Sequence, residues 1–174
     1  ISKHSSKGQK ILDVGVGLGR LLAYFPDLER YGVDISKHYL PLAQKQGINV
    51  CLSKIEEMPY RDNFFDIVVC TDVLEHVIDL NLCIEKILCV LKPGGKLIIR
   101  TPYKESLKNY LAPDYPYHMA HLRSFDEYGL RIIFEKLFDC AFLELAPGGY
   151  LRVDALIRYA IPVYKWEALV RRSI

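Results

Sequence analysis

Residues near the start of the chain combine an acid with closely spaced glycines, a pattern that could hold a nucleotide. The apolar run Lys10–Leu12 leads into Asp13, followed by Gly15, Gly17 and Gly19. Glycine suits turns in which the backbone takes positive φ or approaches a ligand closely. A helix that begins just beyond such a turn offers unpaired N–H groups and a partial positive charge. The pattern therefore predicts a strand, a glycine turn and a helix, with a nucleotide-like ligand across the turn.

The spacing of these glycines distinguishes between cofactors. The dinucleotide fingerprint G-x-G-x-x-G/A requires a small residue where this chain has Arg20, which argues against an NAD-dependent oxidoreductase. The acid-x-G-x-G-x-G order of residues 13–19 instead resembles the first motif of the class I S-adenosylmethionine-dependent methyltransferases. This resemblance implies S-adenosyl-L-methionine as the cofactor and S-adenosyl-L-homocysteine as the product. It also implies that Asp13 supports the glycine turn, which lies against the methionine and ribose.

A second acid follows at the end of the next expected strand. Asp34 comes 19 residues after Gly15, and Ile35 follows it. A carboxylate at this place can accept hydrogen bonds from both ribose hydroxyls. NAD enzymes use the same device, so Asp34 supports a nucleoside without choosing between the cofactors. We expect both Asp34 and Ile35 to contact the cofactor.

Residues 53–60 resemble the acid-x-E-x-L-P-F segment of the methyltransferase family. The resemblance implies that a backbone N–H and an acid of this loop contact adenine. Lys54 stands where the family has its acid, so this chain departs from the pattern. Ile55, through its backbone, and Glu56, the nearest carboxylate, are the expected contacts.

Three later segments resemble the small-molecule, type 11-like branch of the family. Residues 72–77 match D-V-L-E-H-V and follow Thr71, residues 91–97 match L-K-P-G-G-x-L, and residues 121–125 match H-x-R-x-F. The first of these implies that the methionine end of the cofactor is lined by Thr71, Asp72 and His76. The resemblance covers most of the chain and implies methyl transfer to a small molecule, with oxygen as a possible acceptor atom.

A hydroxyl acceptor needs a general base, whereas a neutral amine or a thiolate can react without one. Three histidines are candidates: His76, His118 and His121. His76 belongs to the shared motif and is expected to pack beside the cofactor. His121 is the candidate catalytic base. The alternative is a structural role, because a histidine before a helix often only bonds to backbone, and the sequence favours this alternative. No group of residues indicates a metal site.

Strand-like and helix-like segments alternate along the chain, which is typical of an α/β fold with a mainly parallel sheet. We expect a Rossmann-like methyltransferase fold, with seven strands, a C-terminal antiparallel hairpin and helices on both faces. The parallel strands are expected at 10–14, 31–35, 49–52, 65–70 and 96–100. Helices are expected at 19–25, 37–46, 80–91 and 124–138, the last opened by a Ser124–Glu127 capping box. The hairpin is expected at 141–145 and 153–159, around Gly148-Gly149.

Length and composition fit a single domain spanning residues 1–174. The first residue is Ile1 rather than Met, which is typical of a fragment that lacks an N-terminal segment or of a processed form. A net charge of +2 predicts no nucleic-acid surface, and the five cysteines are expected to be small buried residues of a reducing, cytoplasmic protein.

The end of the chain is basic and aromatic. Residues 151–174 carry five Lys or Arg against two acids, with aromatic residues between them. One interpretation is contact with a membrane or an amphiphilic acceptor. The favoured one is a last strand followed by a helix packed on the core, with a basic extension over 160–174. A non-catalytic module that binds the cofactor or a protein partner remains the alternative function.

Overall fold

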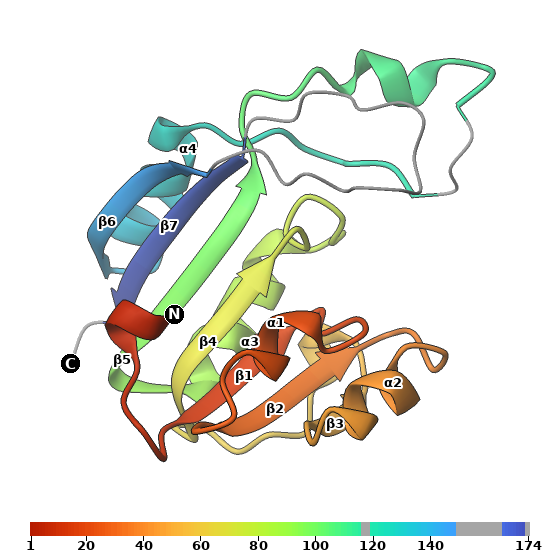
Figure 1. Cartoon of the computed structure of the whole chain (residues 1–174). Helices are drawn as coiled ribbons and strands as arrows, with labels where there is room; N and C mark the ends of the chain where they lie inside the picture. Colours follow the sequence, from red (N-terminus) through yellow and green to blue (C-terminus); the bar gives the residue numbers. More distant parts are fainter. Residues whose placement is uncertain (116–118, 149–164, 173–174) are drawn as a thin grey trace.

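In the computed structural model, seven strands form one sheet in the order β3-β2-β1-β4-β5-β7-β6 (Figure 1). The structure describes residues 1–115, 119–148 and 165–172, with side chains up to residue 141. The strands are β1 (Lys10–Val14), β2 (Glu29–Asp34), β3 (Asn49–Leu52), β4 (Phe65–Thr71), β5 (Leu91–Pro102), β6 (Cys140–Gly148) and β7 (Lys165–Arg172). The first five are parallel, and β7 runs antiparallel to both β5 and β6. The α/β class, the parallel sheet and its antiparallel C-terminal pair are confirmed.

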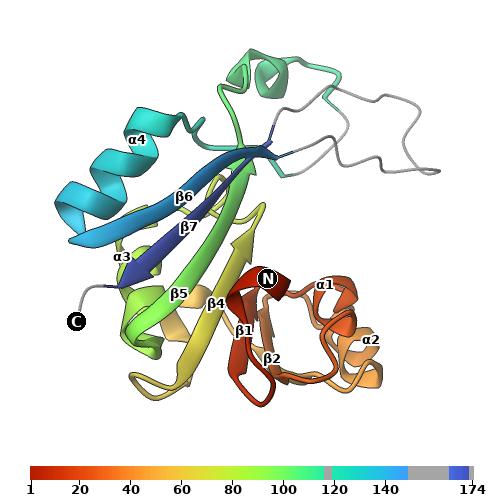
Figure 2. The ribbon, with the colours of Figure 1, turned by 60° about the vertical axis from the view of Figure 1, so that its left-hand side comes forward.

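Helices cover both faces of the sheet (Figure 2). The α-helices are α1 (Arg20–Ala23), α2 (Leu40–Lys45), α3 (Leu80–Val90) and α4 (Glu127–Arg131), and a π-helical segment η4 (Ile132–Leu137) continues α4. Short 3-10 turns are η1 (Ser2–His4), η2 (Ile55–Glu57) and η3 (Leu107–Leu111). Within these described elements, no helix has the length and apolar character needed to cross a membrane.

The side chains of the central strands point alternately to the two faces of the sheet, and each face has its own hydrophobic core. Leu12 and Val68 lie in the larger core, with Ile84 of α3 and Phe134 of η4. Their neighbours Ile11, Val69 and others belong to a second core, formed with Leu22, Leu40 and Ala43 of α1 and α2. Because successive side chains of a strand point to opposite faces, a continuous apolar run is buried on both sides.

The C-terminal part of the sheet differs from the sequence expectation. The helix expected at the end of the chain is wrong, because residues 165–172 form β7, inserted between β5 and β6. The strand expected at 153–159, and the Gly149 half of the expected turn, lie outside the described residues. Trp166, Ala168 and Val170 alternate with larger or charged neighbours, a period of two that suits a strand.

The helix expected from Ser124 begins later. Asp126 is its N-cap, accepting a hydrogen bond from Gly129 N at 2.7 Å, so the Ser124–Glu127 capping box is wrong. The carboxylate of Asp126 is the better-placed acceptor, because it directly precedes the first helical residue. Three of the five cysteines, Cys70, Cys83 and Cys140, are buried, and all five are free thiols.

Close packing of β2 against the glycine turn predicts a steric effect at Gly32. A Cβ added there would lie 2.6–2.8 Å from the side chain of Val16. We expect Gly32→Ala to lower the free energy of unfolding by about 1–3 kcal/mol, through overpacking. The loss should be smaller in a Val16→Ala background, where room is available, as measured by urea unfolding in a double-mutant cycle. Equal losses in both backgrounds would contradict the steric explanation.

Candidate functional site

The parallel register brings the ends of four strands into one row. Val14 of β1 is paired with Val33 of β2 and Cys70 of β4, and Cys70 is paired with Ile99 of β5. The next residue of each strand therefore lies just beyond this row: Gly15, Asp34, Thr71 and Arg100. Ligands of open α/β sheets bind at this edge, next to the first strand.

The glycine turn has the backbone conformation that the sequence predicts. Gly15, Gly17 and Gly19 have φ angles of 78°, 51° and 77°. An added Cβ at Gly15 would lie 2.5 Å from Val73 Cγ2, and one at Gly19 would lie 2.9 Å from the Ala43 Cα. At Gly17 a Cβ would meet nothing within 4 Å. Two of the glycines are thus required by the fold, whereas Gly17 faces open space.

Asp34 is held against this turn by two backbone hydrogen bonds. Gly17 N donates to Asp34 Oδ2 and Ser36 N donates to Asp34 Oδ1, both at 2.8 Å. Each carboxylate oxygen keeps acceptor capacity after these bonds. The orientation of the carboxylate is therefore fixed before any ligand arrives.

Asp13 lies beneath the turn and is almost fully buried, at 3% exposure. Burial, and next the charge of Asp34, raise the pKa of Asp13 from 3.8 to about 7, while Arg100 opposes the shift. Its Oδ1 is buried without a hydrogen-bond partner among the described residues. A neutral Asp13 is favoured by this environment at slightly acidic pH.

Asp72 and Arg100 form a two-part link across the ends of β4 and β5. Asp72 N donates to Arg100 O at 2.8 Å, and Arg100 Nη2 lies 2.5 Å from Asp72 Oδ2. Asp72 has a φ of 56°, a left-handed conformation that Asp tolerates. Arg100 Nε is buried without a partner within the described part of the chain. Sequence reasoning missed Arg100, although an arginine ending an apolar strand was a visible signal.

The residues predicted to contact adenine differ in how far they are buried. Ile55 begins η2 with its side chain 8% exposed in the larger core, and Lys54 precedes it as an exposed residue. The carboxylate of Glu56 accepts a hydrogen bond from the Cys83 thiol of α3. Burial, and next this bond, raise the pKa of Cys83 to about 12. Ile35 is 72% exposed beside Asp34.

Two of the three candidate histidines, His76 and His121, are in contact. The rings of His76 and His121 lie edge to face, with centroids 4.6 Å apart. His76 Nδ1 bonds to Ala120 O at 3.3 Å, and burial, and next His121, lower the pKa of His76. His118 lies outside the described residues.

His121 is bonded to side chains, so the preferred backbone interpretation is wrong for it. Its Nδ1 contacts the Glu105 carboxylate and lies 2.9 Å from the Tyr110 hydroxyl. Tyr110 in turn donates to Glu105 Oε1 at 2.7 Å. Burial, and next Glu105, raise the pKa of Tyr110. Sequence reasoning missed Glu105 and Tyr110, which lie 16 and 11 residues before His121.

Arg123, the arginine of the H-x-R-x-F segment, has a structural role in the site. Its guanidinium donates to the carbonyls of Leu74, Val77 and Ile78 at 2.5–3.1 Å. Leu122 N also donates to Glu75 O, at 2.8 Å. These bonds tie residues 120–123 to the turn after β4, and so bring His121 to His76.

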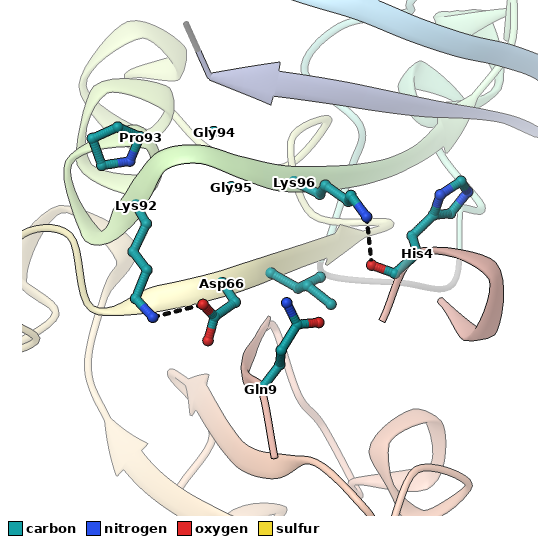
Figure 3. Close-up of a pocket in the computed structure, with 9 residues that line it drawn as sticks. His4, Gln9, Asp66, Lys92, Pro93, Gly94, Gly95 and Lys96 are labelled. Carbon is teal, nitrogen blue, oxygen red and sulfur yellow. Dashed lines mark hydrogen bonds and ion pairs between the residues drawn. The ribbon is translucent and has the colours of Figure 1, made fainter. Parts of the chain in front are cut away.

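A hollow of about 130 Å³ lies at the opposite end of the sheet (Figure 3). Lys92 bonds there to Asp66 at 2.6 Å, and Lys96 donates to His4 O at 2.8 Å. Because both ammonium groups already have acceptors, we place the functional site at the glycine turn instead.

Comparisons with known proteins show which family this chain belongs to. A family model described as a methyltransferase domain, of type 11, matches residues 12–99. An uncharacterized protein of Methanocaldococcus jannaschii is 31% identical over 160 residues, covering 89% of this chain and 69% of that protein. A ubiquinone biosynthesis O-methyltransferase of Coxiella burnetii is 36% identical over 114 residues, covering 60% and 48%. The chain thus spans about half the length of several relatives.

A similar fold occurs in a solved structure of an S-adenosylmethionine-dependent methyltransferase from Methanosarcina mazei. The TM-score is 0.79 at 18% identity, and the match covers 99% of this chain and 96% of that one. At this identity the likeness concerns the fold.

The buried position of Asp13 predicts a pH effect on stability. Its pKa is raised in the folded state, so the folded protein binds more protons than the unfolded chain between pH 3.8 and about 7. Stability therefore falls as pH rises through this window, by on the order of 4 kcal/mol at most. We expect Asp13→Asn to remove this component. Urea unfolding from pH 4 to 8 checks it, and parallel profiles for both proteins would refute it.

Proposed function

The chain belongs to the class I S-adenosylmethionine-dependent methyltransferases of the type 11 branch, and we propose that it transfers a methyl group to a small-molecule acceptor, at oxygen. The observation that carries the proposal is the glycine turn beside Asp34, where Gly17 N–H holds the carboxylate. The family's cofactor is S-adenosyl-L-methionine, which supplies a methyl group bound to a sulfonium when it is present.

The residues at the turn suit a ribose and its neighbours. Asp34 has acceptor capacity for the ribose hydroxyls, and the open space at Gly17 lets a ligand approach the backbone. Asp13 supports the turn from below, with Gly15 and Gly19 fixing its shape. These contacts are proposals that follow from the positions of the residues.

The methionine end of the cofactor carries an ammonium and a carboxylate. The ends of β4 and β5 present a negative side chain and a positive one, which could pair with these two groups. Asp72 offers a carboxylate, and Arg100 offers a guanidinium whose Nε has no partner among the described residues. We assign this end to them, together with Thr71 and His76. We assign the contacts with adenine to the backbone of Ile55 and to the carboxylate of Glu56. Ile35 is proposed to lie against the cofactor beside them.

The acceptor is placed beside the paired histidines. His121 is the proposed base, because Glu105 holds its Nδ1 and leaves Nε2 for the acceptor's proton. Holding the acceptor close and in line supplies much of the effect in such transfers. An oxygen acceptor is supported by the O-methyltransferase among the relatives.

Binding of S-adenosyl-L-homocysteine is the first test. We expect the protein to bind it in calorimetric titration and to ignore NAD. Asp34→Ala should weaken the binding at least about tenfold, since it removes both the ribose acceptor and the bond to Gly17 (each such polar contact contributes about 1.4 kcal/mol or more). Absence of binding by the folded protein would refute the proposal.

Turnover is then measured with hydroxyl, amine and thiol acceptors. Methyl transfer to a hydroxyl supports the full proposal. Binding without any transfer would favour the alternative, a non-catalytic module, which the replacement of the adenine-loop acid by Lys54 makes worth testing.

Gly17→Ala separates cofactor approach from folding. A Cβ at Gly17 meets no protein atom within 4 Å, so the fold loses only the backbone strain of positive φ, about 1–2 kcal/mol. The same Cβ would occupy the ligand's approach, so we expect a marked loss of S-adenosyl-L-homocysteine affinity. Gly94→Ala is the matched control, because Gly94 has a φ of 73°, an open Cβ position and a place at the far end of the sheet. Equal affinities in both variants would contradict the assigned site.

A further inference from the structure

Three side chains with metal-ligating atoms converge after β4. Glu75, His76 and His121 each place a ligand atom within 4.8 Å of those of the other two. Glu75 is 1% exposed, and both histidines are partly buried. The first two are neighbours in sequence, whereas the third comes from a segment 45 residues further on.

We propose that Glu75, His76 and His121 bind a divalent transition-metal ion of the zinc type. Two imidazoles and one carboxylate are a ligand set that such ions take, with at least one coordination position left for water or a substrate atom. Magnesium and calcium prefer all-oxygen ligands, and this set contains two nitrogens.

The second layer of contacts suits metal ligation. Each imidazole is engaged at Nδ1, His76 by Ala120 O and His121 by the Glu105 carboxylate. When Nδ1–H donates to an oxygen, Nε2 carries the lone pair that a metal needs. Metal-bound histidines commonly have this arrangement, in which the outer oxygen fixes the ring and the tautomer. Tyr110, which donates to Glu105, extends the layer by one further group.

The backbone around the cluster is also fixed in advance. Arg123 bonds to three carbonyls of residues 74–78, and Leu122 N bonds to Glu75 O. These contacts span the two segments that supply the ligands. The ligand atoms are thus brought together by the fold, which lowers the entropy lost when an ion binds.

The site deepens the proposed function, on which this step rests. An acceptor hydroxyl bound to the ion would lose its proton to water more easily, because a metal lowers the pKa of a bound oxygen acid. The acceptor oxygen would then donate an electron pair to the methyl carbon while the carbon–sulfur bond breaks. The electron pair of the broken bond stays on the sulfur, which changes from a sulfonium to the neutral thioether of S-adenosyl-L-homocysteine. With the ion bound, His121 is a metal ligand, and water replaces it as the group that takes the acceptor's proton.

Cobalt(II) provides the probe, because its visible absorption reports nitrogen and oxygen ligation directly. We expect the chelator-treated full chain to bind one Co²⁺, which Zn²⁺ displaces. His76→Ala and His121→Ala should abolish the spectrum, and Glu75→Gln, similar in shape, should weaken binding strongly. Glu105→Gln should lower affinity about 10–100-fold, the effect of an outer-layer group. His38→Ala, at an exposed histidine before α2, is the matched control and should bind like the unmodified protein.

All variants are checked for folding by circular dichroism, and His121→Ala and Glu75→Gln, which are not assigned to the cofactor, are also checked by S-adenosyl-L-homocysteine titration. Folded His76→Ala and His121→Ala proteins that keep the cobalt spectrum would overturn the site, as would loss of the spectrum in His38→Ala. S-adenosyl-L-homocysteine binding without any cobalt binding overturns the metal site alone. Cobalt binding without S-adenosyl-L-homocysteine binding supports the site and refutes the proposed function.

Discussion

The parallel register of β1, β2, β4 and β5 is the constraint on which the rest of the site depends. Backbone hydrogen bonds align Val14, Val33, Cys70 and Ile99 in one row near the carboxyl ends of the four strands. Apolar side chains on both faces hold this register, because a slip by one residue would exchange the two cores. Every residue assigned to the cofactor follows from it or from a loop that it anchors.

Several charged side chains lie at this edge of the sheet, which lowers the stability of the fold, and an opposite charge offsets part of the loss. Burial, and next the charge of Asp34, disfavour the ionised form of Asp13 and raise its pKa. Arg100 opposes it and also pairs with Asp72. The arrangement keeps polar groups buried at the carboxyl ends of the strands, where apolar residues would pack better. Sites that bind ligands commonly trade stability for such groups.

The sequence predicted those features that depend on neighbouring residues in the chain. The strands at Lys10–Val14 and Asn49–Leu52 have the expected bounds, because apolar runs and flanking turns suffice to define them. The same reasoning found the positive-φ glycines and brought Asp34 to the turn. It failed for β7, since Lys165–Arg172 becomes a strand through pairing with two distant strands. Arg100, Glu105 and Tyr110 were missed because their roles come from partners that only the tertiary fold supplies.

The position of β7 between β5 and β6 also sets an order on folding during synthesis. Among the strands that the structure describes, β6 has β7 as its single neighbour in the sheet, yet β7 is made after it. While the ribosome is still making residues 165–172, β6 has no strand to pair with, and the free edge of β5 is open to other chains. The half of the sheet that carries the glycine turn can form by then, since β1 to β5 are already complete. In a nascent chain, the edge assigned to the cofactor would therefore form before β7 covers the exposed side of β5.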